Sequence, residues 1–342
     1  MSGEPTVFWV GASTSGALGS AARGIRRLEI DDRGGWRLDE PVEVGENPMF
    51  LALRDERIVV SHELAPGGVS VWTSDAASGR LSPIAAEGLA DGDPCHVAIS
   101  PGGAWALAAN YSGGSVTAHP IDGPARADAR SRAAFAGTGP DTDRQESAHL
   151  HQVVFDGATV LGPDLGSDRI RLLELDEADG ALTPSGEIVL HTGAGPRHLV
   201  VTGRVALVAN ELDRTVSVLD LDARAELGWY PIDDRVAFRG MGVSAIRLTR
   251  GGVVLVGDRD ADALVGLRFD RTARTLEHVA SVPTGGVHPR DLEVTHDERF
   301  ALVADQGSDS IAIIALDEAG APRELLDTVP TPAPACLARV PR

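Results

Sequence analysis

The sequence has little of several features that define other protein classes. Only two of its 342 residues are cysteine, and aromatic residues make up 4%. Two cysteines can form at most one disulfide, which is too few to hold a chain of this size together. We therefore expect a reduced, cytoplasmic setting. No run of about 18 apolar residues occurs, and a transmembrane helix is therefore not expected. The first residues also lack the basic and then apolar segments of a signal peptide.

Basic residues are scarce as well, with 31 Lys and Arg against 50 Asp and Glu and a formal net charge of −19. Nucleic acids and anionic membranes bind clustered basic residues, so neither is expected as a partner. A small anionic ligand could still be held at a local site of arginine and histidine. The low aromatic content offers little material for an exposed protein-binding patch.

Glycine and proline are abundant, with 39 and 21 residues, which suits many short strands joined by tight turns. Residues 195–220 read as three such strands in succession. Arg197 and His198 stand where the first strand begins, and Glu211 stands where the second ends. Variants of this stretch recur along the chain. A repeat of this size, rich in short strands, is typical of propeller blades.

The repeats are evenly spaced. Equivalent starting positions are Pro48, Pro94, Leu150, Pro196, Val243, Pro289 and Pro334. Successive differences are 46, 56, 46, 47, 46 and 45 residues, and the long interval contains residues 123–147, which read as a loop excursion. Apolar residues two apart, such as Leu199 and Val201, indicate strands, and no helical stripe of similar length occurs.

The two ends of the chain complement each other. Residues 334–337 resemble a first strand with nothing after it, whereas residues 6–10, 25–30 and 36–38 supply three later strands with no first. Pairing them makes a seventh blade and closes the ring without an exposed sheet edge. Arg339 is a misfit at an expected apolar position. We therefore predict an all-β, seven-bladed β-propeller that spans residues 1–342 as a single domain.

Strand order predicts where polar groups gather. Because neighbouring strands are antiparallel, the start of strand one and the end of strand two of every blade lie on the same face, and strand one lines the central channel. Groups that do not repeat from blade to blade are the better functional candidates, since the architecture does not require them. These are His149, His151, Arg197, Glu211, Arg259 and Arg290.

Other groups at these positions have structural alternatives. His96 and His198 could bind a ligand or could cap a strand. Asn or Asp recurs at the end of strand two, at positions 110, 164, 210, 258 and 305, which favours a structural role because these side chains bond nearby backbone. No Gly-x-Ser-x-Gly elbow and no close-spaced set of zinc ligands is evident, so neither a serine nucleophile nor a metal site is predicted.

The same motifs resemble the lactonase family of seven-bladed propellers, which includes bacterial 6-phosphogluconolactonases and to which a fungal carboxymuconate-lactonising enzyme is related. The likeness covers essentially the whole chain and is carried by residues 149–155, 163–168, 195–198, 210–212 and 289–291. Two features depart from the family pattern. The turns at residues 202–204 and 250–252 lack the usual Pro-Asp-Gly, and Arg247 stands where histidine is often expected.

The resemblance implies hydrolysis of a sugar δ-lactone, with 6-phosphogluconolactone as the first candidate and no metal or other cofactor. The implied roles are a base for the attacking water (His151, His149 or Glu211), an oxyanion-stabilising group (Arg197) and substrate-binding groups (Arg259, Arg290, His198 and His96). A carboxymuconate-type cycloisomerase, another lactone hydrolase, and a non-catalytic propeller that binds a ligand or a protein remain alternatives. The sequence does not indicate an oligomeric state.

Overall fold

The structure is a computed structural model that describes residues 4–15, 21–75, 79–123 and 125–342. These residues form strands and turns almost throughout. Helix in the described ranges is limited to two three-residue 3₁₀ turns, η1 (Leu165–Ser167) and η2 (Gln306–Ser308). The predicted all-β class is confirmed.

The chain divides into two compact units. Unit 1 comprises Met1–Pro41 and His198–Arg339, and unit 2 comprises Val42–Arg197 and Val340–Arg342. The prediction of a single domain over residues 1–342 stays a prediction.

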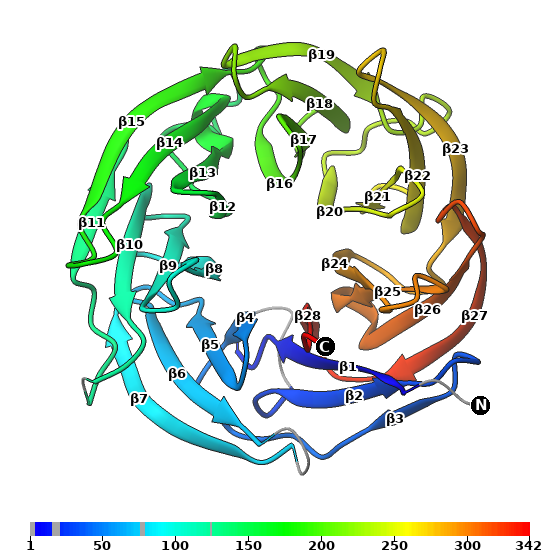
Figure 1. The fold of residues 1–342 in the computed structure, drawn as a ribbon. Helices are drawn as coiled ribbons and strands as arrows, with labels where there is room; N and C mark the ends of the chain where they lie inside the picture. Colours follow the sequence, from blue (N-terminus) through cyan, green and yellow to red (C-terminus); the bar gives the residue numbers. More distant parts are fainter. Residues whose placement is uncertain (1–3, 16–20, 76–78, 124) are drawn as a thin grey trace. The chain divides into compact units, whose positions relative to one another are not determined.

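Unit 2 contains three four-stranded antiparallel sheets, which we number as blades 1 to 3 (Figure 1). Blade 1 is β4 (Pro48–Arg54), β5 (Arg57–His62), β6 (Gly68–Ser74) and β7 (Leu81–Leu89). Blade 2 is β8 (Pro94–Ile99), β9 (Trp105–Asn110), β10 (Ser115–Pro120) and β11 (Ser131–Ala134). Blade 3 is β12 (Val154–Asp156), β13 (Thr159–Asp164), β14 (Arg169–Leu175) and β15 (Leu182–Val189).

Unit 1 contains four more sheets, and the first strand of blade 4 includes the boundary between the units. Blade 4 is β16 (Pro196–Thr202), β17 (Val205–Asn210), β18 (Thr215–Asp220) and β19 (Ala225–Pro231). Blade 5 is β20 (Val243–Leu248), β21 (Val253–Asp258), β22 (Ala263–Asp270) and β23 (Thr275–Pro283). Blade 6 is β24 (Pro289–Val294), β25 (Phe300–Asp305), β26 (Ser310–Leu316) and β27 (Pro322–Pro330). Blade 7 is β28 (Pro334–Arg339), β1 (Thr6–Ala12), β2 (Arg26–Ile30) and β3 (Trp36–Leu38).

The seventh blade joins the two ends of the chain. Strand β28 pairs with β1 in antiparallel register, with Leu337 opposite Val10 and Arg339 opposite Phe8. This pairing confirms the predicted closure, because the last strand of the sequence supplies the missing first strand of the blade that the N-terminal residues form. Arg339 stands where the sequence pattern predicts an apolar residue. It is accommodated there because its guanidinium donates to the Val294 carbonyl at 2.8 Å.

Packing between successive blades explains why second strands are so apolar. Strands β9, β17, β21 and β25 are buried along their whole length, since each lies in the middle of a blade whose two faces are covered. In unit 1, one core cluster joins Leu207 and Val216 of blade 4 to Val254 and Val265 of blade 5. The fourth strands are more exposed, and β19 consists of partly buried and exposed residues only.

Two sequence expectations differ from the structure. The excursion at residues 123–147 is not all loop, because β11 lies inside it and pairs with β10 as the fourth strand of blade 2. Pro124 lies outside the described residues. The first strand of blade 3 was expected to begin near Leu150, but β12 begins at Val154. Leu150 instead forms an isolated bridge with Asp164, and residues 151–153 are not part of a strand.

Candidate active site

A β-bulge interrupts the beginning of several first strands. In blade 2, Pro94 is opposite Asn110 and His96 is opposite Ala109, so Cys95 is the extra residue. Met49 and Arg290 are the extra residues in blades 1 and 6. A bulge redirects side chains and ends the regular alternation. It falls at the repeat position that Arg197 occupies in blade 4, and period-two sequence patterns do not reveal it.

Within unit 2, three rings cluster beside the bulge of blade 2. The ring of Tyr111 stacks on His149, with centroids 4.4 Å apart and an interplanar angle of 13°. The same tyrosine meets His151 edge-on at 5.5 Å. His149 and His151 are both buried. The structure therefore brings the two predicted histidines together around a tyrosine that sequence reasoning did not select.

The two histidines differ in what their ring nitrogens contact. In His149, Nδ1 lies 3.0 Å from the Tyr111 carbonyl oxygen and Nε2 lies 2.9 Å from Glu146 Oε1. Both of these partners are acceptors, and a base needs a nitrogen whose lone pair is available. His151 contacts Cys95, with Nδ1 3.8 Å from Sγ. The contacts of His149 are those of a positioning residue.

Asp164, at the end of the second strand of blade 3, anchors this cluster. Its Oδ1 accepts the backbone N–H of His149 at 2.8 Å, and its Oδ2 accepts Arg171 Nε at 2.9 Å. The equivalent Asn110 and Asn210 donate to hydroxyls on the neighbouring third strand, at Thr117 and at Ser217. These contacts hold the three side chains in place, but they differ from the bonds to the directly following backbone that a turn role predicts.

Within unit 1, Glu211 and Arg259 form a buried ion pair. Arg259 Nη2 lies 2.9 Å from Glu211 Oε2, and the two side chains are 9% and 4% exposed. Arg259 also donates through Nη2 to the Val243 carbonyl at 3.0 Å. Each residue directly follows a second strand, so the strand-order argument brings together two groups 48 positions apart. The pairing itself was not predicted.

The remaining candidates occupy first strands. Arg197 and His198 are buried on β16, and Arg290 is half-buried at the bulge of β24. His96 is buried on β8, where its ring lies against Phe50 with centroids 4.0 Å apart. Their predicted roles in substrate binding or oxyanion stabilisation stay predictions.

A second charged cluster in unit 1 was not selected from the sequence. Arg247 Nε donates to Glu293 Oε2 at 3.0 Å, and Arg247 Nη2 lies 3.4 Å from Asp291 Oδ1. Although burial alone would lower the pKa of Arg247, the carboxylates of Glu293 and Asp291 raise it. The arginine that replaces the expected histidine is therefore held by two acidic partners from blade 6.

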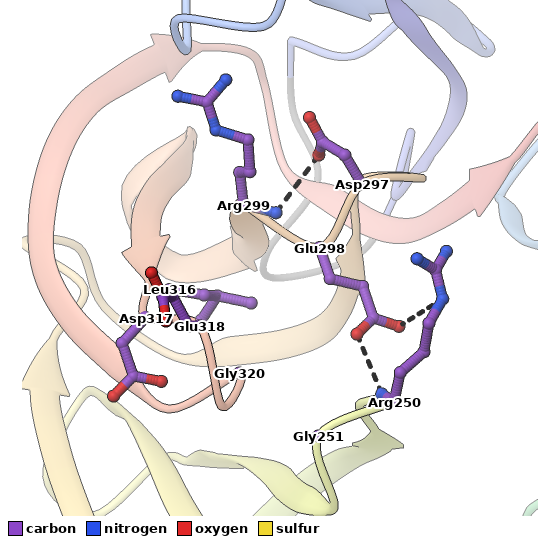
Figure 2. Close-up of a pocket in the computed structure, with 9 residues that line it drawn as sticks. All are labelled: Arg250, Gly251, Asp297, Glu298, Arg299, Leu316, Asp317, Glu318 and Gly320. Carbon is purple, nitrogen blue, oxygen red and sulfur yellow. Dashed lines mark hydrogen bonds and ion pairs between the residues drawn. The ribbon is translucent and has the colours of Figure 1, made fainter.

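Two cavities lie at the other edge of the blades, where first strands turn into second strands. Figure 2 shows one of about 490 Å³ in unit 1, lined by the turn after β20, the turn after β24 and the turn after β26. The Glu298 carboxylate in this cavity already has a protein partner, since its Oε2 accepts the backbone N–H of Arg250 at 2.8 Å. A cavity of about 520 Å³ in unit 2 is lined by the corresponding turns of blades 1 and 2. A hollow that recurs between blades reflects the architecture rather than one specific site.

Two further observations concern the described part of the chain. It holds no group of three or more His, Cys, Asp or Glu residues arranged to bind a metal ion. It also has no helix with the length and apolar character needed to cross a membrane.

Comparison with known proteins agrees with the fold and the motifs. Residues 7–339 match the family described as lactonase, 7-bladed beta-propeller. A 6-phosphogluconolactonase from Bacillus subtilis strain 168 is 31% identical, with 97% of each chain covered. Another from Serratia proteamaculans strain 568 is 28% identical and covers 86% of this chain and 88% of its own. The structure of a periplasmic gluconolactonase from Pseudomonas aeruginosa is 27% identical, with a TM-score of 0.88 and 99% of both chains covered.

These relatives confirm two predictions made from the sequence, the seven-bladed propeller fold and the enzyme class of an esterase that acts on lactones. The family match covers nearly the whole chain. The chain therefore belongs to the lactonase family of seven-bladed β-propellers.

Proposed function

We propose that the protein hydrolyses 6-phosphogluconolactone to 6-phosphogluconate. The observation that carries the proposal is the full-length similarity to a 6-phosphogluconolactonase, which is 31% identical over 97% of both chains. Hydrolysis of a lactone needs a base and a positive charge for the carbonyl oxygen, and unit 2 contains both kinds of group in its buried His149, His151 and Arg197. A lactone is an activated ester, and modest acid–base assistance suffices to open it.

In this scheme His151 is the general base. Its ring takes a proton from water as the water oxygen attacks the lactone carbonyl, and the proton passes to the ring oxygen when the carbon–oxygen bond breaks. His149 is a poorer candidate, since both of its ring nitrogens are occupied by acceptors. A positioned base contributes about 10²–10⁴-fold to such a reaction.

Arginines supply the electrostatic part of the proposal. Arg197 stabilises the negative charge that develops on the carbonyl oxygen. Glu211 is engaged by Arg259, so we assign it to orienting that arginine rather than to proton transfer. Arg259 and Arg290 are proposed to bind the phosphate, and His198 and His96 to contact the sugar. None of these roles requires a cofactor.

The test is the initial rate of 6-phosphogluconate release from freshly prepared lactone, compared with spontaneous hydrolysis. We expect a rate well above the spontaneous one and its loss in Arg197→Ala. A panel of glucono-δ-lactone, other lactones and carboxymuconates separates this function from the cycloisomerase and from other lactonases. Turnover of none of them would favour a ligand-binding propeller. The cytoplasmic location also stays a prediction, and one similar structure is of a periplasmic protein.

A further inference from the structure

One carboxylate in unit 2 holds two segments that lead to proposed site residues. Asp168 is buried and directly follows η1, in the turn between the second and third strands of blade 3. Its Oδ1 accepts the Gln145 amide at 2.7 Å and the backbone N–H of Gly195 at 2.8 Å. Its Oδ2 accepts the backbone N–H of Gly193 at 2.7 Å. Hydrogen bonds to a carboxylate are stronger than those between neutral groups, so one buried side chain fixes both segments.

The first of these segments leads to Arg197. Gly193 and Gly195 have φ angles of +83° and +60°, and glycine adopts many backbone conformations with little preference among them. A single residue, Pro196, separates Gly195 from Arg197, and it begins β16. The carboxylate of Asp168 therefore fixes the point from which β16 starts, and with it the position of the buried arginine.

The second segment leads to the histidine cluster. Gln145 is fully buried four residues before His149, and its amide also donates to the Leu165 carbonyl at 2.8 Å. The backbone N–H of His149 is held at 2.8 Å by Asp164, at the other end of the same turn. Since burying an amide is costly unless its hydrogen bonds are made, the contacts of Gln145 fix this segment against the turn that carries Asp168.

Blade 6 shows which part of this arrangement belongs to the architecture. Asp309 directly follows η2, and its φ of +54° equals that of Asp168. Its Oδ1 accepts the backbone N–H of Ala333 at 2.8 Å. Ala333, like Gly195, immediately precedes the proline that begins the first strand of the next blade. One bond of this kind therefore recurs between blades, whereas the further bonds of Asp168, to Gln145 and to a second glycine, join the two segments of the proposed site.

We propose that Asp168 is a positioning residue for lactone hydrolysis, because it keeps the strand start that carries Arg197 and the segment that leads to the histidines in one fixed arrangement. A base and an oxyanion-stabilising group are effective only in the correct geometry, and a displacement of about 1 Å can lower the rate about 10²-fold. The inference rests on the proposed function and deepens it, since Asp168 has no role in the scheme above. Asp168 acts through Arg197 and His151 and not through contact with the substrate.

The test compares Asp168→Gly with Asp309→Gly. Glycine adopts the left-handed conformation of these residues without strain, so each variant removes the carboxylate and keeps the turn. With 6-phosphogluconolactone, kcat of Asp168→Gly should fall about 10- to 100-fold while KM stays near wild type, since the groups that it positions act in the transition state. Asp309→Gly removes the recurring bond in blade 6, and its kcat should match wild type.

Two further variants separate positioning from a general loss of stability. Asp168→Asn keeps one acceptor oxygen and should recover part of the lost kcat, and it replaces Asp168→Gly in the comparison if the glycine variant does not fold. Asp168→Gly combined with Arg197→Ala should lose less activity than the product of the two separate losses, because the first change acts partly through the arginine. Fully multiplicative losses would contradict the proposal.

Hydrogen exchange keeps this inference separate from the proposed function. Asp168→Gly should speed exchange in residues 139–149 and in residues 190–197 together, since one acceptor serves both, whereas Asp309→Gly should affect residues 331–337. An unchanged kcat in Asp168→Gly, an equal loss in Asp309→Gly, or faster exchange in only one of the two segments would overturn the proposal. If the wild-type protein hydrolyses no lactone, the proposed function fails, and exchange alone decides whether Asp168 joins the segments.

Discussion

Glu211 and Arg259 follow the second strands of two successive blades in unit 1, and their side chains form an ion pair of 2.9 Å that is almost completely buried. Gly242 lies directly against the pair, since a Cβ at that glycine would be 1.8 Å from the Glu211 carbonyl oxygen. Each of these two buried charges is stabilised by the other, so removing one leaves an unpaired charge in the interior.

The first prediction concerns this mutual dependence. Glu211→Gln or Arg259→Gln alone should lower the free energy of unfolding by about 3–5 kcal/mol, because the remaining charge is buried without its partner. The double variant should lose clearly less than the sum of the two, as urea unfolding of all four proteins would show. The same cycle on the exposed Arg204–Asp222 pair of 2.8 Å is the control and should show little coupling. Additive losses at Glu211 and Arg259 would contradict the prediction.

The second prediction separates the two histidines of unit 2. His151→Gln should reduce kcat about 10²–10⁴-fold and remove the rise of activity with pH that a base produces. His149→Gln should reduce activity less and keep the shape of the pH profile, because His149 acts through its contacts with Tyr111 and Glu146. The measurement is the pH dependence of kcat/KM for each variant. A flat profile in His149→Gln with a normal one in His151→Gln would reverse the assignment.

The third prediction concerns Gly242, whose φ is +65°. Gly242→Ala combines an unfavourable backbone conformation with a clash against Glu211, and it should destabilise unit 1 by several kcal/mol. Gly203 is a matched control, since its φ is +59° and nothing lies within 4 Å of a Cβ there. Gly203→Ala should cost only about 1 kcal/mol. Equal unfolding midpoints for the two variants would show that the close approach to Glu211 is unimportant.

The architecture was accessible from the sequence because every blade repeats the same pattern of strand starts, and because the two termini are incomplete in complementary ways. Leu337 opposite Val10 confirms that reasoning. The site was only partly accessible. Strand order identified Glu211 and His151 as candidates, but their partners depend on contacts between distant residues. The bulge that makes Cys95 an extra residue also leaves no mark in a period-two pattern.

The fourth prediction uses the pKa of a buried histidine in blade 2. Burial lowers the pKa of His119 to about 4, although the Ala127 carbonyl that it contacts and the nearby charge of Asp128 raise it somewhat. The unfolded chain binds this proton near pH 6.5, so the stability that neutral His119 provides is complete above that pH. It is lost as pH falls toward 4, by about 3 kcal/mol. His119→Gln should remove this part of the pH dependence, as the difference between the two unfolding curves would show.

The last prediction concerns Asp305 at the end of β25, whose contribution to stability is lost as pH rises rather than as it falls. Both carboxylate oxygens are buried without a hydrogen-bond partner, and the hydroxyl of the nearby Thr284 donates to the Asp262 carbonyl at 3.2 Å. The pKa of Asp305 is raised to about 7, mainly by burial, while the nearby Thr284 hydroxyl lowers it and the charge of Asp262 raises it. At the equivalent positions, the amide nitrogens of Asn110 and Asn210 donate to hydroxyls of strand three.

Because the unfolded chain releases this proton near pH 3.8 and the folded chain releases it near 7, stability is greatest below pH 3.8 and falls as pH rises to 7. The loss amounts to about 4 kcal/mol. Asp305→Asn should abolish it and should therefore be more stable than wild type at pH 8 but not at pH 4. The contributions of Asp305 and His119 oppose each other over the same pH range, so they partly cancel in the wild-type curve. Only the difference curves of the two variants reveal them, and parallel curves for Asp305→Asn and wild type would contradict the assignment.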